Sequence, residues 1–191
     1  MDLNFIIIDK FLDDPDRVRR EALSLDFTKI QESVPGVRSS SPFVRNKTEV
    51  ETKIKTIFAG EIVWDWTQDS FYFQSCQGST KTWIHKDSQE QGQGEWAGVL
   101  FLTPNPNHDA GTAVYLDRDI CYEYFLSHGM DPETSIEEFN HGSVIDMGSG
   151  NVYNRLVLYR GKYLDHSSIK PGFGETLETS RLTQTFWFDV K

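Results

Sequence analysis

The stretch Trp83-Ile84-His85-Lys86-Asp87 contains a His-x-Asp pair that begins in the segment Thr82–Lys86, which is predicted to be a β-strand, and ends one residue after it. Side chains two positions apart in a strand point to the same face, so the imidazole of His85 and the carboxylate of Asp87 would converge on one point. A second histidine from a distant strand would complete a two-histidine, one-carboxylate set, which holds Fe(II) on one face and leaves the opposite face open. The candidate is His166, whose neighbour Asp165 is expected to point to the other face.

The part of the chain that precedes these strands carries the signals of one short strand and two helices. Phe5–Ile8 reads as a strand. The sequence Asp13-Asp14-Pro15-Asp16 predicts a helix start, because it combines acidic caps with a proline in the first turn. A second helix is predicted to begin at Asn46, with Glu49 three residues later as in a capping box. Residues 31–46 between the helices are predicted to be a loop.

From Ile62 onward, short runs rich in aromatic and β-branched residues alternate with connections rich in Gly, Pro, Asn and Ser. Such runs are typical of strands. The predicted strands are Ile62–Thr67, Ser70–Cys76, Thr82–Lys86, Ala97–Thr103, Thr112–Leu116, Ser143–Met147, Val152–Arg160, Lys162–His166 and Arg181–Val190. Many short strands favour a sandwich or barrel, and a jelly roll would bring the distant strands of His85 and His166 together.

Composition limits the possible classes of protein. A chain of 191 residues is most simply one globular domain. Its formal net charge of −10 disfavours binding to nucleic acid through phosphates and docking on an anionic membrane. The first nine residues have an apolar run too short for a signal peptide or an anchor. Two cysteines, Cys76 and Cys121, form no disulfide framework, so we expect a reduced, cytoplasmic location.

The last predicted strand combines an apolar character with an arginine that would point inward. Arg181 and Thr183 share a strand face with Thr185 and Trp187. A buried arginine is costly unless it is paired, and a small dicarboxylate would pair it well because guanidinium groups match carboxylates. Thr183 would add a hydroxyl to the same anion. Two readings of Arg38 are open, contact with substrate at the mouth of the site or a solvated loop arginine, and the second is the one expected.

Several segments between about Phe71 and Val190 form a recognisable series. They are the His-x-Asp pair of residues 83–87, the strand and turn Val99–Asn105, the strand Ala110–Tyr115, the run Asn154–Gly161 that leads to His166, Arg181-Leu182-Thr183, and Phe186-Trp187-Phe188. Together they resemble the Fe(II)/2-oxoglutarate-dependent oxygenases, particularly their prolyl-hydroxylase-like branch. This chain departs from the pattern by a longer gap from His166 to Arg181, by Ala110-Gly111-Thr112 in place of Gly-Gly-Glu, and by an insertion at 117–142.

The resemblance implies a fold and a chemistry. The fold would be a double-stranded β-helix (a cupin-like jelly roll), mainly β with flanking helices, in one domain spanning 1–191. Residues 1–61 would form an N-terminal helical flank and 62–191 the β-helix core. Fe(II) would be bound by His85, Asp87 and His166, which are the catalytic residues. The co-substrate 2-oxoglutarate would be bound by Arg181, Thr183 and Tyr72, and O2 would be the oxidant.

By the same resemblance the enzyme would be a dioxygenase that releases succinate and CO2. Retention of Asp87 favours hydroxylation, since related halogenases replace that carboxylate with a small residue. Two other readings stay open at this point. One is a cupin-like protein that binds a metal or small ligand and is either non-catalytic or independent of 2-oxoglutarate. The other is a nucleic-acid demethylase, which the acidity of the chain disfavours. The substrate, a small molecule or a peptide, and the oligomeric state are not predicted.

Overall fold

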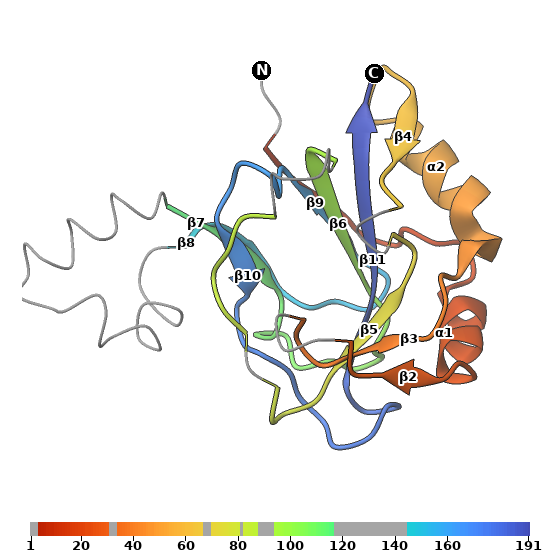
Figure 1. The fold of residues 1–191 in the computed structure, drawn as a ribbon, viewed down its shortest axis with the longest axis vertical. Coiled ribbons are helices and arrows are strands. Elements are labelled where there is room, and N and C mark those ends of the chain that lie inside the picture. Colours follow the sequence, from red (N-terminus) through yellow and green to blue (C-terminus); the bar gives the residue numbers. More distant parts are fainter. Residues whose placement is uncertain (1–3, 31–33, 67–69, 81, 88–93, 117–144) are drawn as a thin grey trace, which may run out of the picture.

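The structure is a computed structural model that describes residues 4–30, 34–66, 70–80, 82–87, 94–116 and 145–191. In these residues the strands form two sheets, and every strand pair is antiparallel. Helices cover one face of the larger sheet, and the smaller sheet lies on its other side (Figure 1). None of the described helices is long and apolar enough to cross a membrane.

The larger sheet has a simple strand order, with one strand off the main path. In order it contains β1 (Phe5–Ile8), β9 (Leu156–Tyr159), β6 (Trp96–Phe101), β11 (Arg181–Val190), β5 (Phe73–Cys76), β3 (Val37–Ser39) and β2 (Phe27–Thr28), while β4 (Ile62–Trp64) pairs with the end of β11. The smaller sheet contains β10 (His166–Ser168), β7 (Thr112–Tyr115) and β8 (Ile145–Ser149). The helices are α1 (Pro15–Leu23) and α2 (Lys47–Lys55), the latter preceded by the 3-10 turn η1 (Val44–Asn46).

Strand β11 lies in the middle of the larger sheet, and its first eight residues are buried. Because side chains alternate along a strand, β11 presents one set of residues to the helices and another to the smaller sheet. The helix-facing set is Leu182, Gln184, Phe186 and Phe188. The opposite set is Arg181, Thr183, Thr185 and Trp187, which line a cavity as their predicted shared face requires.

The main hydrophobic core lies between the helices and the larger sheet. Helix α1 contributes Val18 and Ala22, and α2 contributes Val50 and Ile54, all with no exposed side-chain surface. They pack in one cluster with Phe186 and other apolar residues of the sheet. Burying an aliphatic or aromatic side chain of this size contributes roughly 1.5–3 kcal/mol, so this layer supplies much of the stability of the fold.

Several local predictions are confirmed and others are wrong. The strands Phe5–Ile8 and Arg181–Val190 have the predicted bounds, and Asp14 caps α1 by accepting a hydrogen bond from the Arg17 backbone N–H at 2.9 Å. The predicted loop 31–46 instead contains β3 and η1. The predicted strand Thr82–Lys86 is reduced to an isolated bridge at His85. The predicted insertion 117–142 lies outside the described residues.

The predicted capping box at Asn46 is also wrong, for a reason that lies in the core. The Asn46 side chain is 1% exposed and donates to Gln184 Oε1 at 2.7 Å instead of capping α2. Gln184 is fully buried on the helix-facing side of β11, so its amide needs a polar partner there. Glu49 is used elsewhere, since it accepts hydrogen bonds from the Asp13 backbone N–H and from Lys53.

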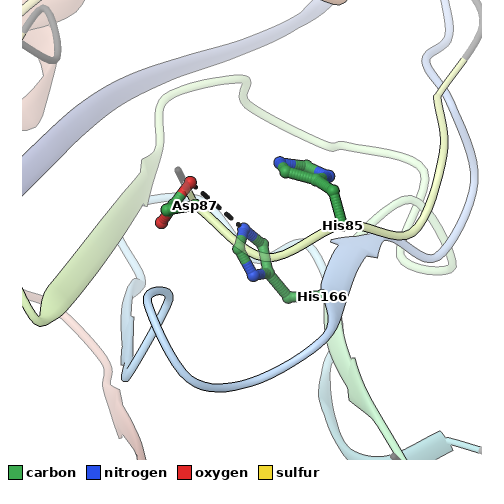
Figure 2. Close-up of side chains that lie close together, drawn as sticks. All are labelled: His85, Asp87 and His166. Atoms are coloured by element: carbon green, nitrogen blue, oxygen red, sulfur yellow. Dashed lines mark ion pairs between the residues drawn. The ribbon is translucent and has the colours of Figure 1, made fainter. Parts of the chain in front are cut away.

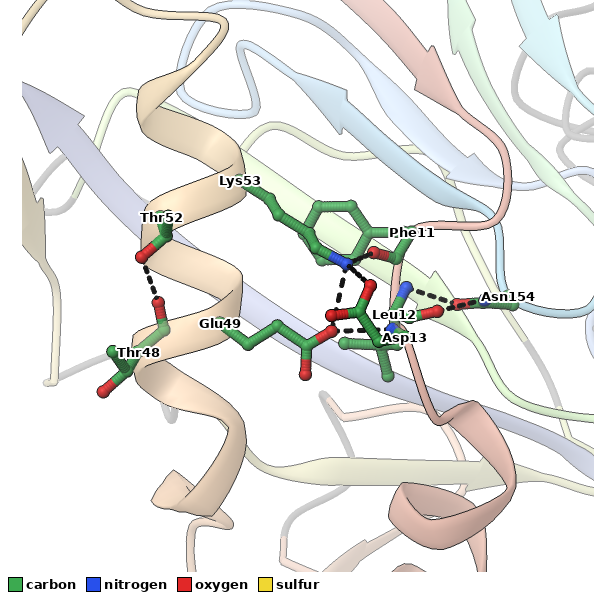
Figure 3. A network of polar contacts seen from close by, with 8 residues as sticks. All are labelled: Phe11, Leu12, Asp13, Thr48, Glu49, Thr52, Lys53 and Asn154. Atoms are coloured by element: carbon green, nitrogen blue, oxygen red, sulfur yellow. Dashed lines mark hydrogen bonds and ion pairs between the residues drawn. The ribbon is translucent and has the colours of Figure 1, made fainter.

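A polar network ties the segment between β1 and α1 to its surroundings (Figure 3). Asn154 accepts a hydrogen bond from the Leu12 N–H at 2.8 Å and donates one to the Leu12 carbonyl at 2.9 Å. Lys53 of α2 donates to the Phe11 carbonyl and to Asp13, both at 2.6 Å. Because Leu12 lies in the core cluster, these bonds satisfy backbone groups that water cannot reach.

We predict that Asn154→Gly destabilises the protein by about 2 kcal/mol, because two buried hydrogen bonds contribute about 1 kcal/mol each. Asn154 has a φ of 61°, which glycine adopts without strain. Asn105→Gly is the matched control, since Asn105 has a φ of 47° but is exposed. Urea unfolding measures both variants, and equal losses for the two would contradict this account.

Candidate metal centre

The three residues predicted as metal ligands converge in the structure (Figure 2). His85, Asp87 and His166 each offer one ligand atom, and these atoms all lie within 4.8 Å of one another. The Nε2 of His166 lies 3.7 Å from Oδ1 of Asp87, and the two imidazole ring centroids are 4.5 Å apart. Among the described residues this is the one group of histidine, cysteine or acidic side chains that meets the spacing of a metal site.

Backbone contacts position this group without a regular strand. His85 and His166 exchange both backbone hydrogen bonds, with N–O distances of 3.1 and 2.8 Å, as a directly opposed antiparallel pair does. Two residues further on, the Asp87 N–H donates to the Gly161 carbonyl at 2.9 Å. The segment is therefore anchored at both ends of the His-x-Asp pair, so the predicted convergence holds although the predicted strand does not.

Each imidazole is oriented by a hydrogen bond to a nearby backbone carbonyl. The Nδ1 of His85 lies 3.0 Å from the Trp83 oxygen, and the Nδ1 of His166 lies 2.9 Å from the Leu164 oxygen. A carbonyl oxygen only accepts hydrogen bonds, so each Nδ1 carries the proton and each Nε2 keeps its lone pair. This is the tautomer that a metal-binding histidine uses, with its other nitrogen held by a fixed acceptor.

Asp87 is held by a hydrogen bond and by a close backbone approach. The indole Nε1 of Trp187 donates to its Oδ2 at 3.1 Å, which leaves Oδ1 directed toward His166. A Cβ on residue 161 would lie 2.1 Å from Oδ2, so only a glycine at that position leaves room for the carboxylate. The set of one fixed carboxylate and two imidazoles matches the donors that ferrous iron takes in a facial triad.

Burial adjusts the titration of the site. His166 is 4% exposed, and burial lowers its pKa from 6.5 to about 4, with Asp87 acting in the opposite direction. Its ring is therefore neutral at physiological pH and needs no deprotonation to bind a metal. The ring of Tyr159 packs against it with a centroid distance of 4.5 Å, and burial raises the pKa of that phenol, so it is also neutral.

The metal-ligand group opens into a cavity of about 100 Å³ between the two sheets. Arg181 and Thr183, the predicted residues for a dicarboxylate, line the same cavity. Arg181 is 4% exposed, and its Nε donates to the Ala110 carbonyl at 2.9 Å. Its Nη2 donates to Thr112 Oγ1 at 3.3 Å. The guanidinium carbon lies 5.3 Å from the ring centroid of Phe101, which fixes the plane of the group.

The departure at Ala110-Gly111-Thr112 has a structural role. This turn supplies the carbonyl and hydroxyl oxygens that hold the Arg181 side chain. A Cβ on residue 111 would lie 1.8 Å from the Ser149 carbonyl oxygen, so glycine permits the close approach of β8 to β7. The segment in which this chain differs from the family pattern therefore contacts the Arg181 side chain and orients it.

Tyr72 is not among the described residues that line the cavity. Its backbone carbonyl accepts a hydrogen bond from the Thr185 N–H at 3.0 Å, so its main chain extends the pairing of β5 with β11. The predicted contact of its hydroxyl with 2-oxoglutarate stays a prediction. Asp165, predicted to point away from the metal ligands, contacts Lys86 at 3.5 Å and forms no part of the ligand group, in agreement with the prediction.

The structure adds lining residues that the sequence reading missed. The prediction that Arg38 is a solvated loop residue is wrong, since it lies on β3, is 9% exposed and lines the cavity. Gln74 and Cys76 of β5 line it as well. Their spacing of two along a strand gave a usable signal, because they must share a face. For Arg38 no local signal existed, since β3 has three residues in a polar run.

Several solved structures share the fold of this chain. HygX from Streptomyces hygroscopicus, solved with nickel and 2-oxoglutarate bound, has a TM-score of 0.64 at 11% identity over 97% of this chain and 82% of its own. A Trichoplax adhaerens prolyl hydroxylase in complex with a hypoxia inducible factor peptide has a TM-score of 0.58 at 15% identity, covering 97% and 83%. A Pseudomonas putida prolyl-4-hydroxylase has a TM-score of 0.56 at 15% identity, covering 98% and 93%.

No protein-family model matches the sequence, and no curated protein matches it significantly. At these identities the likeness concerns the fold. The chain has the double-stranded β-helix fold of the iron- and 2-oxoglutarate-dependent oxygenases, which confirms the predicted fold class and the resemblance on which it was based.

We predict that Trp187→Phe weakens divalent metal binding about 10-fold or more, because loss of a hydrogen bond to a ligating carboxylate typically has this effect. Phenylalanine keeps most of the ring packing but cannot donate to Asp87. Trp66→Phe is the control, since Trp66 is 51% exposed and lies outside the cavity. A metal titration by calorimetry measures both, and unchanged affinity in Trp187→Phe would remove this role.

We also predict that Gly161→Ala abolishes metal binding, because the added methyl group would occupy the space of the Asp87 carboxylate. Gly78→Ala is the matched control, since the nearest heavy atom to its added Cβ lies 3.8 Å away. Circular dichroism checks that both variants fold. A folded Gly161→Ala protein with normal metal affinity would show that Asp87 is not a ligand.

Proposed function

We propose that this protein is an Fe(II)- and 2-oxoglutarate-dependent dioxygenase of the hydroxylase type. The observation that carries the proposal is one cavity whose lining joins a two-histidine, one-carboxylate group to a buried arginine. A metal-binding cupin without 2-oxoglutarate chemistry has no need for such an arginine. The fold likeness to HygX and to prolyl hydroxylases supports the same class.

Each residue of the candidate site has a defined role in this proposal. His85, Asp87 and His166 hold the ferrous ion on one face, and the cavity lies on the other. Arg181 pairs with the distal carboxylate of 2-oxoglutarate, and the Thr183 hydroxyl on the same strand face donates to it. The bound ion supplies activation of O2, with 2-oxoglutarate as the reductant that leaves as succinate and CO2. Val99, Tyr159 and Trp187 line the cavity and limit the access of water to it.

The substrate is proposed as a class only. HygX has been solved with hygromycin B bound, and the Trichoplax prolyl hydroxylase with a peptide. Both kinds of substrate therefore fit on this fold, and we propose a small molecule or a peptide side chain. A cytoplasmic location stays a prediction from the cysteine content.

We predict that the metal-free protein, titrated anaerobically with Fe(II) and then 2-oxoglutarate, develops the visible metal-to-ligand charge-transfer band of the chelated co-substrate. His85→Ala, Asp87→Ala and His166→Ala should each lose the band. His108→Ala is the control, because His108 is exposed and does not line the cavity. Metal binding without a band in the wild type would favour the cupin-like alternative, and no metal binding would overturn the proposed centre.

We predict that Arg181→Gln raises the concentration of 2-oxoglutarate needed for half-saturation by about 10-fold or more, because a charge-assisted pair is lost. The plateau intensity of the band should be retained, since the metal ligands are unchanged. Arg45→Gln is the control, because Arg45 is an exposed arginine that pairs with Glu21. An unchanged requirement in Arg181→Gln would assign the co-substrate carboxylate to another residue.

A further inference from the structure

The cavity contains a second buried arginine that the proposed co-substrate does not use. Arg38 is 9% exposed, and its guanidinium carbon lies 5.6 Å from the ring centroid of Trp187. Trp187 is the residue that donates to Asp87 at 3.1 Å. Arg38 is therefore separated from a proposed metal ligand by one aromatic ring.

Strand register explains why the Arg38 side chain reaches the cavity. Arg38 is opposite Gln74 of β5, and Gln74 is opposite Thr183 of β11. Residues in one such row project from the same face of a sheet. Since Gln74 and Thr183 both line the cavity, Arg38 enters the same space from β3, at the edge side of the sheet.

The two arginines are held against different partners. Arg181 is tied to the Ala110–Thr112 turn and lies over Phe101. Arg38 lies over Trp187, which stands six residues further along β11 than Arg181. Arg181 is thus held beside β7, whereas Arg38 lies beside the ring that donates to Asp87, and the proposed function assigns the co-substrate carboxylate to Arg181.

The charges of the side chains that line the cavity also favour a second anion in it. Its described lining contains two arginine side chains, Arg38 and Arg181, and one carboxylate, that of Asp87. A ferrous ion and the 2-oxoglutarate dianion would cancel each other, so a further monoanion brings the cavity to neutrality. Buried ionic groups are stable only when they are balanced. A guanidinium has five N–H donors, so Arg38 can bind a ligand in addition to the contacts it makes within the protein.

We propose, as an extension of the proposed function, that the substrate to be oxidised carries a carboxylate group that Arg38 binds. A planar carboxylate accepts two parallel hydrogen bonds from the edge of a guanidinium group. A phosphate dianion would exceed the charge needed for balance. Arg38 is thus a specificity-determining residue, and the reactive carbon of the substrate lies between this carboxylate and the metal.

The test measures binding in the absence of turnover. Protein loaded with Zn(II), which is diamagnetic, and saturated with 2-oxoglutarate is titrated with N-acetylglycine, and separately with N-acetylglycinamide and inorganic phosphate. The readout is the indole ¹H–¹⁵N resonance of Trp187, assigned by its loss in Trp187→Phe. We expect a saturable shift with the carboxylate, none with the uncharged amide, and weaker or no binding of phosphate.

Three arginine variants make the test specific to Arg38. Arg38→Gln should weaken N-acetylglycine binding about 10-fold or more, while 2-oxoglutarate affinity stays within about 2-fold. Arg38→Lys, which keeps the charge, should recover part of the binding even if the glutamine variant is unstable. Arg45→Gln, an exposed arginine pairing with Glu21, should behave as the wild type.

The possible failures are separable. Absence of any 2-oxoglutarate binding to the zinc protein overturns the proposed function, and with it this extension. If 2-oxoglutarate binds but N-acetylglycine produces no saturable shift, or shifts the wild type and Arg38→Gln alike, only the carboxylate proposal is overturned. A loss of 2-oxoglutarate affinity in Arg38→Gln as large as in Arg181→Gln also overturns it, since Arg38 would then belong to the co-substrate site. So does a response to phosphate alone.

Discussion

The burial of β11 on both faces is the constraint on which the rest of the structure depends. A strand in the middle of a sheet places alternate side chains in two separate environments. On the helix side this produces the main core, where one polar residue, Gln184, requires Asn46 as its partner. On the other side it places Arg181, Thr183, Thr185 and Trp187 in a row along the floor of the cavity. One strand therefore separates the stabilising layer from the polar layer.

In the candidate metal centre, separate contacts fix the positions of the two segments, of the imidazole rings and of the carboxylate. The mutual backbone bonds of His85 and His166 set the distance between the two segments. Backbone carbonyl oxygens select the imidazole tautomer. The hydrogen bond from Trp187 and the space left by Gly161 fix the position of the Asp87 carboxylate. Because these contacts come from the protein itself, they hold the donor atoms close to one another, where a metal would bind. Such preorganisation lowers the cost of binding and favours one coordination geometry.

The cavity also collects positive charge inside a protein whose formal net charge is −10. Both buried guanidinium groups are held in place by aromatic rings, Arg38 by Trp187 and Arg181 by Phe101. Acidic groups on the surface favour solubility and repel anions weakly, because water screens them. The guanidinium groups in the low-dielectric cavity attract an anion strongly, but only at short range. The proposed binding of small anions therefore depends on the side chains that line the cavity and is not predicted by the net charge.

The amino-acid sequence by itself determined the elements whose signal is periodic or local. These include the bounds of β1 and β11, the cap of α1, the shared face of Arg181 and Thr183, and the convergence of His85 with Asp87. The tertiary structure alone decided the roles of Asn46, Arg38 and Trp187, which depend on partners a hundred or more residues away or on a three-residue strand. Periodic patterns are visible in the local sequence. Strand register and the partners of buried polar groups are decided only when distant segments pack together.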